Sequence, residues 1–322
     1  MDIREVSDKF GTDEQCLAYL EKMRWPDGVV RCPNCGDKNI QKYERPAREP
    51  KRRSKSRDKD KQNVRQWFYI CLNADCRTQF SPSSGTLFHN THLPLIVWFH
   101  AVALMLNAKK GLSAKQLQRD LKIGGYKTAW YLNHRIREAM REGSLPQMGG
   151  IVEIDETYLG GRQKGHAGKL KNKDIVVGMR ERRGPLRFIH VDDASSKTWK
   201  HILAQNLHSG LDLVMTDEST AARAAIRADA DLRIKHRTIR HRSGRYVEGI
   251  VHTNSIESAF SLLKRGIIGS FHRISIKHLQ KYLNEFSYRF NRRNDTDAFI
   301  ETVGRLCGFP PLTFETLTSE KA

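Results

Sequence analysis

The sequence predicts an α+β protein of several domains, on the strength of its cysteine spacing and two kinds of apolar pattern. Two close pairs of cysteines in the first 80 residues indicate a zinc ribbon. Helical periodicity dominates up to about residue 142, and apolar runs of strand length begin at residue 151. At 322 residues the chain has room for about two domains. We therefore expect a zinc-binding, helical N-terminal half followed by an α/β domain.

The charge balance predicts a polyanionic partner. Lys and Arg number 56 against 36 Asp and Glu, a net charge of +20. Nucleic acid is the commonest partner for such a surface. The longest apolar run, Leu93 to Leu106, is too short to span a bilayer, and the N-terminus lacks the pattern of a secretory signal. We therefore expect no membrane association and a reducing, cytoplasmic compartment.

Residues 1–30 are predicted to form an N-terminal helix. Apolar side chains recur there at helical spacing, at Cys16, Leu17, Leu20 and Met23. Ser7 and Thr12 are suitable caps. The Pro26 and Gly28 turn ends the pattern.

The two cysteine pairs predict a zinc ribbon over residues 31–84. The four ligands are Cys32, Cys35, Cys71 and Cys76. Two thiolates on one tight turn supply half of a tetrahedral zinc site, so the two pairs complete it with structural Zn²⁺. Four unrelated buried thiols are the alternative. The isolated Cys16 and Cys307 are expected to be buried structural thiols.

A polar, basic segment, residues 45–65, separates the cysteine pairs. Thirty-five residues lie between Cys35 and Cys71, against about 15–20 in common zinc patterns. The segment holds almost nothing apolar, so we expect a flexible insertion at the tip of the ribbon. Its candidate DNA contacts are Arg52, Arg53 and Lys55.

Residues 85–142 are predicted to be a helical DNA-binding region. An apolar helix over 86–106 precedes helices at 113–121 and 127–140, which a Gly124-Gly125 turn connects. This order is typical of a helix-turn-helix, and a plain helical hairpin fits it nearly as well. Cations lie on the second helix, with Lys127 and Arg135 as candidate DNA contacts.

The second half is predicted to hold a sheet flanked by helices. Strands are expected at 151–158, 174–182, 186–192 and 211–215, and helices at 197–208, 256–264 and 278–291.

Acidic residues end two of these strands. Asp155 and Asp217 each follow an apolar strand, and Glu257 lies on a helix with Lys264 two turns later on the same face. Carboxylates at neighbouring strand ends point into one crevice, where they can bind two Mg²⁺ ions for phosphodiester chemistry. Ordinary turn residues are the alternative.

A basic loop follows the first of these aspartates. Its cations could hold a polyanion beside the acidic site, or they could simply be solvated. They are Arg162, Lys164, Lys169 and Lys171.

Several of these segments together resemble one family. The segments are Ile154–Gly161, Thr216–Glu218, His252–Glu257, Leu262–Gly266, Tyr282–Arg293, and Cys32–Gly36 with Ser84–Phe88. They are similar to segments of the ISXO2-like transposases of the IS1595 family. The resemblance covers about residues 15–305.

The resemblance implies a ribonuclease-H-like catalytic domain over 150–305, with 306–322 as a tail. It also implies DDE-type transposition of an insertion sequence, a mobile element, by two Mg²⁺ ions. It places the first two metal ligands at Asp155 and Asp217.

The third metal ligand is open between Glu257 and Asn254. Family members have Asn, His or Glu there. We favour Glu257, because carboxylate binds Mg²⁺ better than amide and because Lys264 shares its helix face. Asn254 remains the alternative ligand or a phosphate contact, and His252 is a weaker candidate.

The implied partners are double-stranded DNA, as terminal inverted repeats and as target, and a second copy of the chain in a homodimer or larger assembly. Lys264 and Arg265 would contact DNA beside the metals. A bacterial, nucleoid-associated location is implied as well. The alternatives are a domesticated, catalytically inactive DNA-binding regulator and a structure-specific nuclease of the same fold.

Overall fold

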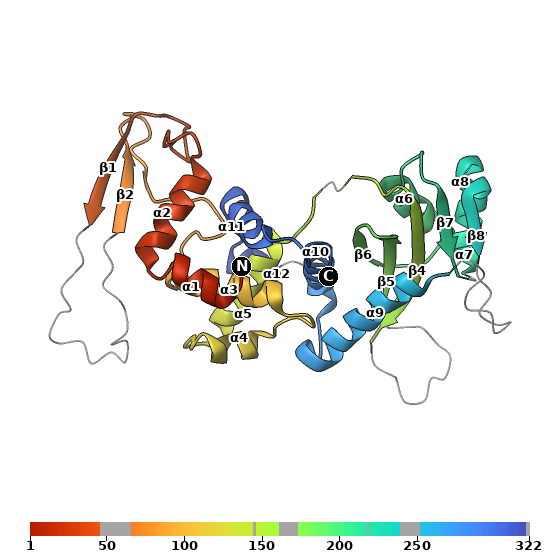
Figure 1. Ribbon diagram of the computed structural model, residues 1–322. Coiled ribbons are helices and arrows are strands. Elements are labelled where there is room, and N and C mark those ends of the chain that lie inside the picture. The colour runs from red at the N-terminus through yellow and green to blue at the C-terminus, as the bar shows by residue number, and fades with distance from the viewer. Residues whose placement is uncertain (46–65, 144–145, 161–172, 218, 239–251, 320–322) are drawn as a thin grey trace. The chain divides into compact units, whose positions relative to one another are not determined.

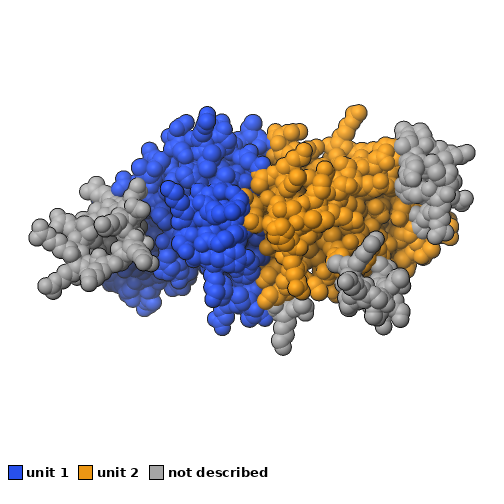
Figure 2. Space-filling view, turned by 90° about the horizontal axis from the view of Figure 1, so that it is seen from below, with its two compact units in different colours: residues 1–107, 114–139, 295–319 blue, residues 108–113, 140–294, 320–322 orange. Residues whose placement is uncertain are grey.

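The protein is described from a computed structural model, in which the chain divides into two compact units (Figures 1 and 2). The structure describes residues 1–45, 66–143, 146–160, 173–217, 219–238 and 252–319. Unit 1 consists of residues 1–107, 114–139 and 295–319, and unit 2 of residues 108–113 and 140–294. Most of unit 2 is therefore inserted in the chain between two helices of unit 1.

Helices make up most of unit 1. They are α1 (Ile3–Lys9), α2 (Asp13–Arg24), α3 (Leu95–Asn107), α4 (Ala114–Asp120), α5 (Tyr126–Ala139), α11 (Ala298–Gly308) and α12 (Phe314–Ser319). The single helix expected over residues 1–30 is in fact two. Thr12 begins α2 in a capping box with Gln15, whereas Asp2, not Ser7, caps α1.

The two helices predicted around the Gly124-Gly125 turn are α4 and α5. The C-terminal end of α5 is embedded in unit 1. Arg135 and Arg137 are 3% and 1% exposed there. Only the first turn of α5, with Tyr126 and Lys127, is well exposed.

The C-terminal helices correct the expected domain boundary. We assigned residues up to 305 to the catalytic domain and the rest to a tail, yet α11 and α12 belong to unit 1. The apolar stripe of α11 completes that core: Phe299 is fully buried and lies 5.8 Å from the Phe99 ring and 6.1 Å from the Phe10 ring. Leu87 N–H also donates to the Leu306 carbonyl. The physical reason is burial. The apolar face of a helix must pack against a hydrophobic core, and that core can come from a distant part of the chain.

A small antiparallel sheet forms the zinc ribbon of unit 1. Its strands are β1 (Ile40–Arg45), β2 (Gln66–Cys71) and β3 (Gln79–Phe80), in the order β1-β2-β3. Ile40 pairs with Cys71 at one end of the hairpin and Arg45 with Gln66 at the other. The chain between β1 and β2 therefore leaves from the end away from Cys71, as expected for an insertion at the tip. Residues 46–65, with Arg52, Arg53 and Lys55, lie outside the described part of the chain.

A mixed five-stranded sheet is the centre of unit 2 and confirms the predicted α/β character. Its order is β6-β5-β4-β7-β8, for β4 (Ile151–Leu159), β5 (Asp174–Glu181), β6 (Leu186–Val191), β7 (Leu213–Thr216) and β8 (His236–Thr238). The first three strands form an antiparallel meander, and β7 and β8 run parallel to β4 and to each other.

Helices pack against both faces of this sheet. On one face, α6 (Ser196–Asn206) and α7 (Thr220–Arg227) pack over Val152, Ile154 and Val214. On the other, α9 (Asn254–Gly266) and α10 (Ile276–Asn291) pack over Val176 and Phe188. Successive β4 side chains alternate between these two faces of the sheet. The position of a residue in β4 therefore tells which pair of helices its side chain faces.

Side chains of α10 cover the edge of β6. Alternate backbone N–H groups of β6 donate hydrogen bonds to side-chain oxygens of α10. The acceptors are Asn291, Ser287 and Gln280, at 2.7, 3.2 and 2.8 Å. These N–H groups of the edge strand β6 are therefore not available to pair with a further strand. α8 (Ala230–Lys235) connects α7 to β8. Within the described residues, none of the helices is long and apolar enough to cross a membrane.

Candidate active site and metal centres

Two aspartates lie on neighbouring parallel strands. Asp217 directly follows β7, as predicted, whereas Asp155 lies inside β4, which continues to Leu159, and not at the end of the strand as we expected. These strands are parallel, and their register places Ile154 opposite Thr216. Asp155 and Asp217 occupy the next position along each strand, so both belong to the face that α9 covers. The predicted convergence of these two residues therefore follows from the pairing of the strands.

Glu257 reaches the same place from the first turn of α9. The close approach of that helix depends on Gly178, which pairs with Asp155 on β5. A Cβ at Gly178 would lie 2.6 Å from the Phe260 ring and 2.7 Å from Ile256. Because residue 178 is glycine, α9 can lie directly against β5 at the position opposite Asp155.

The neighbouring carboxylates influence the ionisation of Asp155 and Glu156. Burial, followed by repulsion from Asp217, raises the pKa of the Asp155 carboxyl to about 7, and the carboxylates of Glu156 and Glu257 add to the rise. Burial and Asp217 also raise the pKa of Glu156. Such a cluster resists full ionisation and is stabilised by a divalent cation, for which carboxylate oxygens are suitable ligands.

The carboxylate oxygens are more widely spread than the cysteine sulfurs. Within the described ranges, only the four cysteines form a group of three or more ligands whose atoms all lie within 4.8 Å of one another.

The candidates for the third metal ligand differ in burial and in their hydrogen-bond partners. Asn254 is exposed at the start of α9, whereas Glu257 is partly buried and accepts a hydrogen bond from Thr253 Oγ1 at 2.9 Å. His252 Nδ1 lies 3.4 Å from Glu153 Oε1. Lys264 and Arg265 are exposed near the end of α9.

Sequence reasoning missed two polar residues beside the site, Ser219 and Glu153. Ser219 binds both acidic neighbours: its N–H donates to Asp217 Oδ1 at 2.8 Å and its hydroxyl to Glu156 Oε2 at 3.2 Å. Glu153 is completely buried on the same face of β4 as Asp155. A charged residue in an otherwise apolar strand, two positions before a candidate ligand, is the signal that could have identified it.

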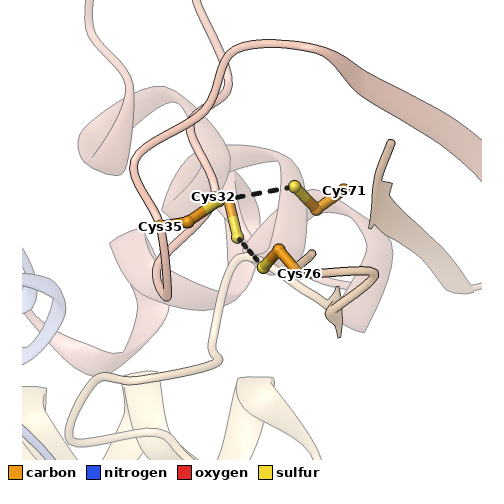
Figure 3. A group of neighbouring side chains, drawn as sticks. All are labelled: Cys32, Cys35, Cys71 and Cys76. Atoms are coloured by element: carbon orange, nitrogen blue, oxygen red, sulfur yellow. Dashed lines mark hydrogen bonds between the residues drawn. The ribbon is translucent and has the colours of Figure 1, made fainter. Parts of the chain in front are cut away.

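The four predicted zinc ligands converge in unit 1 (Figure 3). The sulfurs of Cys32 and Cys76 lie 3.7 Å apart, and those of Cys35 and Cys71 lie 3.6 Å apart. A tetrahedral site with Zn–S bonds of about 2.3 Å has edges of about 3.8 Å. These two distances are close to that edge length, and all four sulfurs lie within 4.8 Å of one another, which supports a zinc site.

The surroundings act differently on the thiols of the cluster. Burial raises the pKa of the Cys71 thiol, and Cys35 is exposed. Hydrogen bonds from Thr78 and Asn34 lower the pKa of the Cys76 thiol to about 6. Trp25 and Phe80 pack beside Tyr69, with ring centroids 5.6 and 5.5 Å from it. Of the isolated cysteines, Cys16 is buried as expected, whereas Cys307 is partly exposed.

The predicted DNA contacts divide into exposed, buried and undescribed residues. Lys127 is exposed. Arg135 is corrected: its guanidinium donates to the His89 carbonyl and lies 4.8 Å from the centre of the Trp98 ring, because the far end of α5 is core. The loop cations Arg162, Lys164, Lys169 and Lys171 lie outside the described residues.

Comparison with known proteins decides the family. Residues 147–291 match the ISXO2-like transposase domain, and residues 11–54 match the transposase zinc-ribbon domain. The chain carries the transposase domain and the zinc-ribbon domain of the ISXO2-like transposases of IS1595 elements. Asp155, Asp217 and Glu257 all fall inside the matched transposase domain.

A relative from a mobile element agrees with this assignment. The transposase is 26% identical over 297 residues to an uncharacterized protein in transposable element ISH50 of Halobacterium salinarum. The similarity covers 87% of this chain and 91% of the relative. The transposase domain and this relative support a role in transposition, and the zinc-ribbon domain with its cysteine cluster supports structural zinc.

Proposed function

We propose that this transposase binds the ends of its element and catalyses DNA cleavage and strand transfer with two Mg²⁺ ions. The observation that carries the proposal is the convergence of Asp155, Asp217 and Glu257 on one face of the sheet, with the Asp155 pKa raised to about 7. This is a set of oxygen ligands with excess negative charge. It is suited to hard divalent cations.

Each residue has a distinct part in the proposed chemistry. Asp155, inside β4, and Asp217, directly after β7, would hold the metals, and Glu257 would supply the third carboxylate from α9. When bound, the metals stabilise the attacking and leaving oxygens of phosphodiester transfer. The exposed Lys264 ammonium binds a DNA phosphate beside them. No covalent bond between protein and DNA is needed.

DNA binding is assigned to the cationic surfaces of both units. Lys127 lies at the exposed start of α5, the end of a helix-turn-helix recognition helix that contacts bases. The zinc ribbon presents its hairpin tip, where the basic segment enters and leaves. We infer that affinity for DNA falls steeply with salt. Two element ends must be held together, so the active species is at least a dimer.

Strand transfer in Mg²⁺ tests the proposal. The substrate is a plasmid that carries the DNA flanking the gene, incubated with wild type, Asp155→Asn and Glu181→Gln. Glu181 is a matched control, because it is a carboxylate at the end of the adjacent strand β5, and it accepts from Gly149 N–H at 3.2 Å. We expect Asp155→Asn to lose about 10³-fold or more in cleavage rate, since metal catalysis supplies several kcal/mol. DNA affinity should remain.

The outcomes separate the candidate functions. Cleavage retained by Asp155→Asn would sink the assignment of the site. Cleavage by wild type without joining identifies a nuclease, and tight binding with neither reaction identifies a regulator. A comparison of Glu257→Gln with Asn254→Ala decides the third position: we expect the first to abolish cleavage and the second to weaken it little.

A further inference from the structure

A buried carboxylate lies two residues before Asp155 on β4. Glu153 is completely buried, and both of its oxygens are used. Oε1 accepts from Arg182 Nε at 2.8 Å, and Oε2 accepts from the backbone N–H groups of Ser255 and Ile256 at 2.8 and 3.1 Å. A buried charge is tolerated only when it is paired and hydrogen-bonded in this way. The residue is therefore committed to protein contacts and is not a further metal ligand.

The two backbone partners of Glu153 begin α9. Thr253 is the N-cap residue of this helix, but its side chain makes no capping hydrogen bond. The N–H groups of the second and third helical residues are those that an N-cap side chain normally takes. Here Glu153 takes both, from a neighbouring strand, and places a negative charge at the positive end of the helix.

This exchange releases the hydroxyl of Thr253 for another task. Thr253 is buried, and its Oγ1 donates to Glu257 Oε1 at 2.9 Å. In a helix with an ordinary cap, the same hydroxyl would accept from the backbone one turn later. The tertiary cap thus leaves a donor that orients the third carboxylate of the site.

Two arginines bind the start of the helix to the sheet as well. Arg182 Nη2 donates to the His252 carbonyl at 3.1 Å, and Arg180 Nη1 donates to the Ser255 carbonyl at 3.0 Å. The backbone just before and within the first turn of α9 is therefore held from both β4 and the end of β5.

We propose that Glu153 is a positioning residue that fastens the start of α9 to β4 and so sets Glu257 against Asp155. The proposal rests on the proposed function of these two carboxylates. In this proposal Glu153 fixes the positions of the metal ligands and does not itself contact the metal or the DNA. Outer partners of metal ligands typically matter by 10–100-fold in metal affinity or activity.

Three variants of the full-length protein test the proposal. Glu153→Gln keeps the shape and removes the charge and one acceptor. Thr253→Val keeps the tertiary cap and removes the hydroxyl. Glu181→Gln is the control, since it removes a neighbouring sheet carboxylate, opposite Val152, that binds the Gly149 backbone rather than α9. Each is measured for amide hydrogen exchange in α9 and α10, for DNA affinity, and for the Mg²⁺ concentration that half-saturates cleavage.

We expect a distinct pattern for each variant. Glu153→Gln should speed exchange in the first turn of α9 but not in α10, and should raise the half-saturating Mg²⁺ concentration about 10–100-fold. Thr253→Val should raise that concentration while leaving α9 exchange unchanged. Glu181→Gln should alter neither, and all three should bind DNA as wild type does.

Two results would overturn the proposal. One is unchanged α9 exchange in Glu153→Gln. The other is wild-type Mg²⁺ dependence in Glu153→Gln while wild type is active. If no protein cleaves DNA, the proposed function fails, yet hydrogen exchange still decides whether Glu153 fastens the helix. If Glu153→Gln does not fold, Thr253→Val decides: wild-type Mg²⁺ dependence in that variant contradicts the orienting hydroxyl.

Discussion

The cysteine cluster of unit 1 and the carboxylate cluster of unit 2 are both sets of metal ligands, but they are assembled differently. The four thiols come from one small ribbon, and their sulfurs already lie at the spacing of a zinc tetrahedron. The carboxylates come from β4, from the end of β7 and from α9, and their oxygens are more dispersed.

The difference shows where each site gets its precision. Short, local turns are sufficient to gather thiols around a structural ion, so the ligand spacing in the sequence is diagnostic. The carboxylates depend on strand register, on Gly178 and on the buried Glu153 cap. Four predictions test this contrast, in order of decreasing effect.

Loss of zinc is expected to affect unit 1 alone, and by the largest amount. Structural zinc contributes on the order of 10 kcal/mol of folding free energy in small zinc modules. Cys71→Ser should therefore lose the bound zinc and the hydrogen-exchange protection of β1 and β2. Metal analysis together with hydrogen exchange checks this. Asp155→Asn is the control and should retain its zinc; equal loss of protection in β4 after Cys71→Ser would contradict the separation of the two sites.

Removal of the Phe299 ring is expected to damage unit 1 rather than unit 2. The ring is fully buried beside Phe10 and Phe99, so Phe299→Ala should cost about 3–5 kcal/mol of unfolding free energy. Denaturant unfolding followed by hydrogen exchange in α3 and in β4 measures it. If β4 lost protection and α3 did not, α11 would belong to the carboxylate unit after all.

Asp155→Asn is expected to stabilise unit 2 when metal is absent. The folded-state pKa of about 7 lies above the ordinary 3.8. The group therefore contributes stability below pH 3.8, and this contribution is lost as the pH rises toward 7. Allowing for partial exposure, the variant should gain about 1–2 kcal/mol over wild type at pH 8 in a chelator.

Thermal unfolding of unit 2 at pH 5 and pH 8 measures this gain. The advantage of Asp155→Asn should grow with pH and should reverse at saturating Mg²⁺, because only the wild type holds the ion with a full set of carboxylates. An equal unfolding temperature for both proteins at pH 8 without metal would show that the carboxylates do not repel one another.

The smallest expected effect concerns the two predicted DNA contacts on α5. Lys127→Ala should weaken DNA binding by about 0.5–1 kcal/mol and reduce the salt slope by about one. Arg135→Met should instead lower stability and leave the slope unchanged, since this guanidinium is buried against Trp98. DNA binding titrations at several salt concentrations distinguish them; equal salt slopes for Lys127→Ala and wild type would remove Lys127 from the interface.

Most of the secondary structure was predictable, because it follows local signals. Most strands of unit 2 contain short clusters of apolar residues, and α4 and α5 flank a glycine pair. The boundaries between the two units were harder to predict from the sequence. Nothing local in Phe299, Val303 and Leu306 says which core receives that apolar stripe, and α11 in fact completes the core of unit 1.

The sequence by itself determined the kinds of ligand and their order along the chain: paired thiols for zinc, and Asp155, Asp217 and Glu257 as separated acidic positions. Tertiary structure alone decided that Asp155 and Asp217 take matched positions on parallel strands, that Arg135 is buried, and that Glu153 caps α9. The physical reason is that burial and register depend on contacts between distant segments, whereas turns and periodicity depend on neighbours in the chain.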